Sequence, residues 1–246
     1  MLEKNYVIQH RYYPFNRYTY SCNRSVDIQT DFCGGGILSG PALKTSIYSY
    51  LLFKSLYQPA TAFQELSKAD PSPVAVLFRY SYWLLIFPPV FSFIGAANFG
   101  WRLGAAEPLV LPISTLAVIS AAYFIVLLFG LATTAVISCW MASTYGANAS
   151  LGRHLALVTM VGEPLILASI AHLYPSVFFN LLVIIPAMIW SVYLLYTGIP
   201  VALNTPPERG MLMASAVVGW LLVAAVSLLG LSMALWTNGV GPLLGV

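Results

Sequence analysis

The sequence is unusually poor in charge. Only 8% of its 246 residues are Asp, Glu, Lys or Arg, whereas 59% are apolar. Soluble domains carry about 25% charged residues, so this chain cannot cover a water-facing surface. Its net charge of +3 is also too small to favour nucleic acid as a partner. The composition therefore excludes a soluble domain, a disordered chain and a nucleic-acid binder, and it predicts an all-α, polytopic membrane protein.

Cysteine and catalytic motifs are equally scarce. The three cysteines, Cys22, Cys33 and Cys139, are too few and too scattered for a disulfide framework. Cys22 and Cys33 lack a second pair of ligands, so we expect free thiols and no metal site. The sequence contains no HExxH motif, no glycine-rich phosphate loop and no paired acids suited to phosphoryl or glycosyl chemistry. We therefore expect no catalytic residues, no cofactor and no enzymatic activity.

Long apolar segments take the place of these motifs. Five of them approach the roughly 20 residues that a helix needs to cross a bilayer. They cover residues 76–99, 111–141, 154–173, 177–199 and 211–236. The second is longer than one span and should tilt or extend into a loop. We expect one five-span membrane domain over residues 76–246.

The region before the first span has two parts. Residues 1–45 are polar and rich in tyrosine and have no helical or strand period, which predicts a flexible tail outside the main domain. The alternatives are a partner-binding arm or an extension upstream of the natural start. Residues 46–75 should form a cytoplasmic interfacial segment. There Ala62, Phe63 and Leu66 fall on one side of a short amphipathic helix that suits a membrane surface.

Loop charges predict the orientation of the protein. With a cytoplasmic N-terminus, five basic residues face the cytoplasm and only Arg102 lies outside. The five are Lys54, Lys68, Arg79, Arg153 and Arg209. Cytoplasmic loops carry an excess of Lys and Arg, so we expect the N-terminus inside and the C-terminus outside.

Glu163 is the only carboxylate within a predicted span, and Pro164 follows it. A charge at mid-membrane costs about 2.5–3.5 kcal/mol, and proline allows a kink. A proton- or cation-linked site is one interpretation. The alternative is a neutral acid bonded to a backbone carbonyl or facing the loop region. His154 and His172 each lie nine residues away, about half a turn round the helix, so we expect both at the membrane interface and neither sharing a metal with Glu163.

The end of the fourth span combines aromatic and helix-breaking residues. Trp190, Tyr193 and Thr197 fall on one helix face. Gly198 should let another backbone approach, and together with Pro200 it should stop the helix. Helix packing and a lipid-facing aromatic belt are the main interpretations of this face, and a ligand pocket is the alternative.

Three segments resemble the Yip1 family of five-span membrane proteins, most closely its bacterial branch. They are Leu56–Phe63, Phe87–Gly95, and Tyr193–Pro200 with the following Thr205–Arg209. The resemblance implies an integral membrane protein with no agreed catalytic residues. Family members usually have Thr-Pro or Ser-Pro at the position of Glu163-Pro164. The acidic motif of the GTPase-binding eukaryotic branch is absent, so GTPase binding is not expected.

The sequence thus favours a non-enzymatic scaffold, assembly or trafficking-like factor of a bacterial inner membrane. We expect its partners to be the lipid bilayer and other integral membrane proteins or a second copy. The candidate binding residues are Glu163, Pro164, Trp190, Tyr193, Gly198 and Pro200. The alternative is a small ion- or proton-linked transporter or channel that uses Glu163 in a proline-kinked third span.

Overall fold

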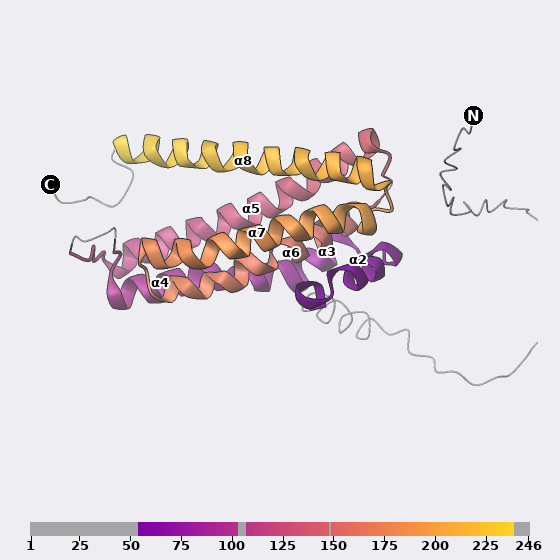
Figure 1. Ribbon diagram of the computed structural model, residues 1–246. Helices are drawn as coiled ribbons and strands as arrows, with labels where there is room; N and C mark the ends of the chain where they lie inside the picture. Colours follow the sequence, from indigo (N-terminus) through magenta and orange to yellow (C-terminus); the bar gives the residue numbers. More distant parts are fainter. Residues whose placement is uncertain (1–53, 103–106, 148, 239–246) are drawn as a thin grey trace, which may run out of the picture. The chain divides into compact units, whose positions relative to one another are not determined.

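The computed structural model describes residues 54–102, 107–147 and 149–238, which form a helical bundle (Figure 1). Five helical segments of this region are long and apolar enough to cross a membrane, which confirms the predicted fold class. They are Pro73–Phe99, Ile113–Tyr145, Leu151–Leu173, Val177–Ala202 and Pro207–Leu235. The predicted tail at 1–45, with Cys22 and Cys33, lies outside the described residues.

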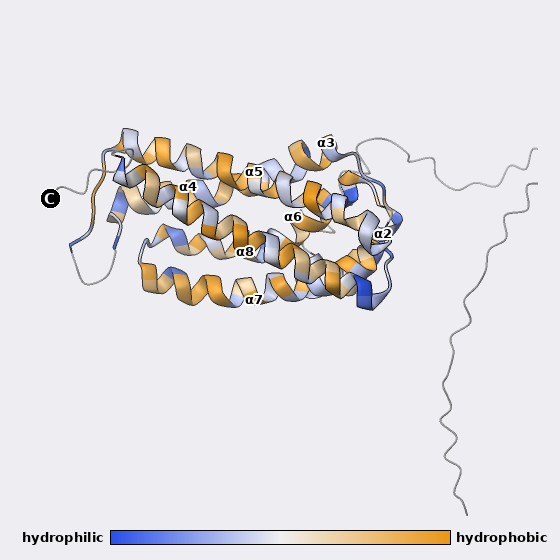
Figure 2. Ribbon diagram, turned by 90° about the horizontal axis from the view of Figure 1, so that it is seen from above, coloured by the Kyte–Doolittle hydropathy of each residue, from blue (hydrophilic) through white to orange (hydrophobic). Residues whose placement is uncertain are grey.

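The element order follows the predicted segments closely. Its members are α2 (Pro59–Lys68), α3 (Pro73–Val76), η1 (Leu77–Ser81), α4 (Tyr82–Phe99), α5 (Ile113–Tyr145), α6 (Leu151–Ala168), η2 (Ser169–Leu173), α7 (Val177–Ala202) and α8 (Pro207–Thr237). The described ranges contain helices and no β-strand. Two isolated β-bridges occur there, one between Trp101 and Leu109 and one between Arg102 and Ser176. Hydrophilic residues gather at the two ends of the bundle, and the middles of the helices are mainly hydrophobic (Figure 2).

The first span is not a uniform α-helix. The turn Leu77–Ser81 is π-helical, and the Tyr82 N–H bonds to the Leu77 carbonyl five residues back. A π-turn inserts one residue into the helix and so changes which side chains face the bundle. Tyr80 and Ser81 are buried here, whereas Arg79 is exposed.

Helix α5 has 33 residues, which corresponds to about 50 Å. The hydrocarbon layer is only about 30 Å thick, so a straight α5 must tilt or extend beyond it, as the sequence predicts. In Figure 1 it runs obliquely across the bundle.

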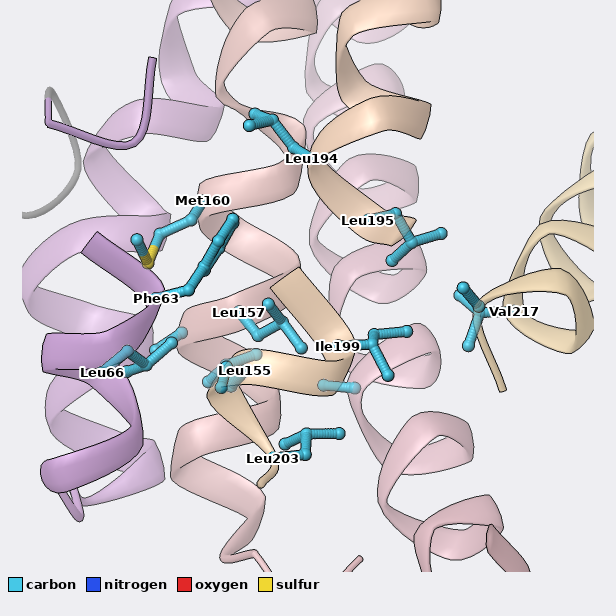
Figure 3. Packing of buried hydrophobic residues seen from close by; sticks show 14 of the residues in the cluster. Phe63, Leu66, Leu155, Leu157, Met160, Leu194, Leu195, Ile199, Leu203 and Val217 are labelled. Atoms are coloured by element: carbon cyan, nitrogen blue, oxygen red, sulfur yellow. The ribbon is translucent and has the colours of Figure 1, made fainter. Parts of the chain in front are cut away.

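Helix α6 is the centre of the packing. In its most apolar stretch 61% of residues are buried, against 6% in α5 and 11% in α7. The hydrophobic cluster around α6 draws on α2, the second half of α5, the end of α7 and the start of α8 (Figure 3). This core lies at the end of the bundle that carries α2 and the α7–α8 turn (Figure 1).

Helix α7 corrects one prediction. Gly198 and Pro200 do not stop the helix, which continues to Ala202. Proline fixes φ near the helical value and removes only one backbone donor, so a helix can continue through it near its end. The Pro200 carbonyl then accepts a hydrogen bond from the Thr205 N–H in the turn that follows.

Helix α2 confirms the predicted amphipathic pattern. Ala62, Phe63 and Leu66 are all fully buried, and α2 packs against α7 and α6. Its apolar face therefore contacts protein, whereas the sequence pattern suggested lipid. The location of α2 at the membrane surface stays a prediction.

Candidate functional site

The segment before the first span is fastened to the third span by a buried hydrogen bond. We call residues 54–68, which comprise a helical turn at 54–57 and α2, the strap. The Ser55 hydroxyl donates to the Glu163 carboxyl oxygen Oε2 at 2.5 Å. Ser55 is fully buried and Glu163 is 5% exposed. Glu163 therefore lies inside the protein. Its hydrogen-bond partner is the Ser55 side chain, which neither interpretation of the sequence predicted.

Charges also connect the two halves of the strap. Lys54 Nζ lies 2.6 Å from Glu65 Oε1, with the lysine side chain mostly covered. Just beyond the strap, the Arg153 Nε–H donates to the Ala69 carbonyl at 3.0 Å. Gly152, beside Arg153, has no room for a Cβ because the Pro71 carbonyl occupies that place. The strap and the linker after it are thus held on α6 from several points.

Gly198 provides the notch for the strap's main apolar anchor. A Cβ built on Gly198 would lie 2.8 Å from Cζ of Phe63 and 2.9 Å from Cδ1 of Leu157. The sequence predicts that Gly198 admits another backbone, but an aromatic ring fills the space instead. Figure 3 shows the Phe63 ring among the buried side chains, near Met160 and Leu157. The family-like segments at 56–63 and 193–200 therefore meet in space.

Two further polar contacts join α6 to the other spans. The hydroxyls of Thr159 and Ser81 lie 2.7 Å apart and link α6 to the π-turn. Ser138 Oγ lies 2.9 Å from His154 Nδ1 and links α6 to α5. Glu163, Thr159 and His154 each bond to a different element of the chain, so α6 acts as the common partner of the strap, the first span and the second span.

His154 corrects another expectation. It is fully buried in the bundle, and its Nε2 has no hydrogen-bond partner among the described residues. The ring is therefore covered by protein and is not exposed on the outside of the bundle. His172 lies at the opposite end of the span, where its Nδ1 is 2.6 Å from Asn180 Oδ1. No group of three metal-ligating side chains occurs in the parts of the chain that the structure describes.

The candidate residues of the fourth span divide into separate places. Trp190 and Tyr193 are exposed on the outer surface of α7, with ring centroids 5.1 Å apart. Gly198 faces the strap, where an added Cβ would meet the Phe63 ring. Pro200 packs against Gly210 of α8, where a Cβ would lie 2.6 Å from the proline Cγ. The structure thus brings Glu163 and Gly198 to the strap, buries Pro164 within α6 and leaves the two aromatic residues facing outward.

Sequence reasoning did not identify Ser55, Ser81 or Ser138 as partners of the α6 polar groups. Each is an ordinary hydroxyl residue in an apolar context, and no local pattern shows which distant residue it reaches. The one available signal is that α6 carries an acid, a threonine and a histidine in an apolar span. Buried polar groups in a membrane need partners, so these three residues require donors or acceptors from neighbouring segments.

The amino-acid sequence is similar to those of known proteins. The Yip1 domain family model matches residues 53–237. The inner membrane protein YohC of Escherichia coli K12 is 31% identical over 179 residues, which cover 72% of this chain and 92% of YohC. YohC of E. coli O6:H1 matches to the same extent. No solved structure matches the chain. Because the family model covers residues 53–237 and the chain has five candidate membrane spans, the chain belongs to the Yip1 domain family of multi-pass integral membrane proteins.

Proposed function

We propose that this protein is a non-enzymatic scaffold or assembly factor of a bacterial inner membrane and acts through helix packing with another integral membrane protein or a second copy. The observation that carries this proposal is the contrast between the two halves of α8. Met213, Ala214 and Val217 in the first half are fully buried. From residue 221 to 235 the helix contains no buried residue.

The second half of α8 offers surface on more than one side. Leu222 and Leu229 are 63% and 67% exposed. At Gly219 and Gly230 an added Cβ would meet nothing within 4 Å. Helix pairs in membranes favour small residues that allow backbones to approach closely, so this half of α8 suits a partner helix. We call residues 219–235 the α8 outer surface.

The remaining parts of the proposal concern the arrangement in the membrane. We propose a tail at 1–45, a cytoplasmic segment at 46–75 and a membrane domain at 76–246. The distribution of basic residues favours an N-terminus in the cytoplasm and a C-terminus outside. Support for the inner membrane comes from the E. coli relative YohC, which is an inner membrane protein. In this arrangement the strap anchors the cytoplasmic end of the bundle, and α8 presents its outer surface within the bilayer.

Photo-crosslinking in intact membranes tests the proposal. A photoreactive residue at position 222 or 229 should give a discrete protein adduct in constant stoichiometry. Matched positions are Val118 on α5 and Phe178 on α7, which are similarly exposed apolar residues of other spans. They should give lipid adducts alone. Equal adduct patterns at all four positions would contradict a partner surface on α8.

A further inference from the structure

A shallow apolar groove runs between α4 and α5 on the outside of the bundle. It has a volume of about 230 Å³. Its walls are Ile86, Pro89, Val90 and Phe93 of α4 and Ser120 and Phe124 of α5. The groove presents only apolar atoms, and both helices belong to predicted membrane spans. A hydrocarbon chain is the ligand that such a surface accommodates.

An exposed arginine lies on the same span, two turns before the groove. Arg79 is separated by seven residues from Ile86. Seven residues correspond to about two helical turns, so Arg79 lies about two turns from the groove along the span, and the π-turn rotates it relative to Ile86 by a fraction of a turn. Arg79 is exposed and has no hydrogen-bond or ion-pair partner among the described residues.

The depth of Arg79 matches that of a phospholipid headgroup. The first span has 27 residues, about 40 Å at 1.5 Å per residue, against about 30 Å of hydrocarbon. With one hydrocarbon boundary placed at Phe99, the last residue of the span, 30 Å corresponds to about 20 residues and places the other boundary at Arg79. Phe78 and Trp83 on either side are both 62% exposed, as expected of an aromatic belt at the headgroups.

Tyr82 connects this headgroup region with the groove. It lies between Arg79 and Ile86 in the sequence, and its ring packs edge-on against Phe124 at 5.3 Å between centroids. Phe124 is itself a wall of the groove. One aromatic contact, between Tyr82 and Phe124, therefore links the region of Arg79 with the apolar groove.

We propose that the α4–α5 groove binds one anionic phospholipid, with its phosphate on Arg79 and one acyl chain along Ile86, Val90 and Phe93. A lipid-facing guanidinium is costly unless it reaches the interface or a counter-ion. The planar guanidinium can bond a phosphate through two parallel N–H donors. Net negative charge on the lipid is favoured because no described carboxylate pairs with Arg79. This proposal does not depend on the scaffold function.

Native mass spectrometry of the full-length protein in mild detergent tests it, with phosphatidylglycerol and phosphatidylcholine titrated separately. The wild type should bind one phosphatidylglycerol in preference to phosphatidylcholine. Arg79→Gln should weaken phosphatidylglycerol binding about fivefold, the factor expected for one basic residue at a membrane surface. Arg79→Lys should retain more binding than Arg79→Gln. Val90→Trp should weaken both lipids because it fills the groove.

Lys68→Gln is the matched control, because Lys68 is also exposed at the same end but lies on α2, away from the groove. It should leave both affinities unchanged. Equal losses in Lys68→Gln and Arg79→Gln would overturn the proposal, as would unchanged affinity in Val90→Trp. Thermal unfolding of each variant identifies any that fails to fold. If Arg79→Gln fails, Arg79→Lys and Val90→Trp still decide, because the first keeps the charge and the second leaves Arg79 intact.

Discussion

Ser55 and Glu163 are hydrogen-bonded across 108 positions of the sequence, and the bond lies inside the protein. It joins the segment before the first span to the middle of the third span. This single hydrogen bond between two side chains thus helps to hold the strap in its place on the bundle. Together with Phe63 in the Gly198 notch, this bond makes the strap part of the membrane domain's core.

Substitution of Glu163 separates a structural acid from a transporting one. Glu163→Gln keeps an oxygen that accepts the Ser55 bond, so it should destabilise the protein by less than about 1 kcal/mol. Glu163→Leu removes the acceptor and should cost about 1–3 kcal/mol. Unfolding of each variant in detergent measures these two changes in stability. A scaffold should keep its partner in Glu163→Gln, whereas loss of an ion- or proton-linked flux in that variant would favour the transporter alternative.

Substitution of Gly198 tests the notch. Gly198→Leu should lower stability by about 1–3 kcal/mol, because it overpacks against Phe63 and Leu157. Phe63→Ala in the same chain should restore part of that loss, and a double-mutant cycle measures the coupling. Gly162→Leu is the matched control, since an added Cβ there meets nothing within 4 Å. Equal destabilisation by the two glycine substitutions would show that Phe63 is not what Gly198 accommodates.

The Ser138–His154 pair gives a third stability test. Ser138→Ala removes the only described side-chain partner of His154, whose Nε2 is already unpaired. Loss of a partner to a buried polar group costs about 1–3 kcal/mol. Ser143→Ala is the control, because Ser143 is exposed and bonds only to the Trp140 carbonyl. The midpoint of thermal unfolding should fall for Ser138→Ala and stay within error for Ser143→Ala.

Cysteine labelling tests the orientation. In a chain with its three native cysteines replaced, Arg209→Cys should resist a membrane-impermeant reagent added to intact cells. Asn238→Cys, beyond the last span, should react with it. Both positions are exposed, so the difference reports the side of the membrane. Reaction at 209 and protection at 238 would reverse the proposed topology.

The bundle could be predicted from the sequence because each span is an apolar segment of sufficient length, a local property. The amphipathic helix at Pro59–Lys68 was predictable for the same reason, since Ala62, Phe63 and Leu66 repeat at helical spacing. What covers that apolar face was not predictable, because lipid and protein favour the same side chains. Likewise, the importance of Gly198 follows from the sequence, but its partner Phe63 lies on a distant element and is fixed only by tertiary packing.

The prediction that Pro200 ends the fourth span was wrong: α7 continues to Ala202, because proline is compatible with helical φ and removes only one backbone donor. The burial of His154 was missed for a related reason. His154 lies at the start of the predicted third span, beside the charged Arg153, which suggested the membrane interface. The Arg153 side chain reaches the Ala69 carbonyl, whereas the His154 ring is buried in the bundle. Adjacent helical residues point in different directions, so one of them does not place the other.

Partner recovery from a Gly230→Leu variant tests the proposed role of α8 most directly. Nothing lies within 4 Å of an added Cβ at Gly230, so the variant should unfold at the same temperature as the wild type. It should nevertheless lose the stoichiometric partner, or the second copy, that co-purifies with the wild type in mild detergent. Arg209→Ala, an exposed change in the first turn of α8 with little energetic effect, should keep both properties. A Gly230→Leu variant that is equally stable and retains its full complement of partner would contradict the proposal that the α8 outer surface carries the function.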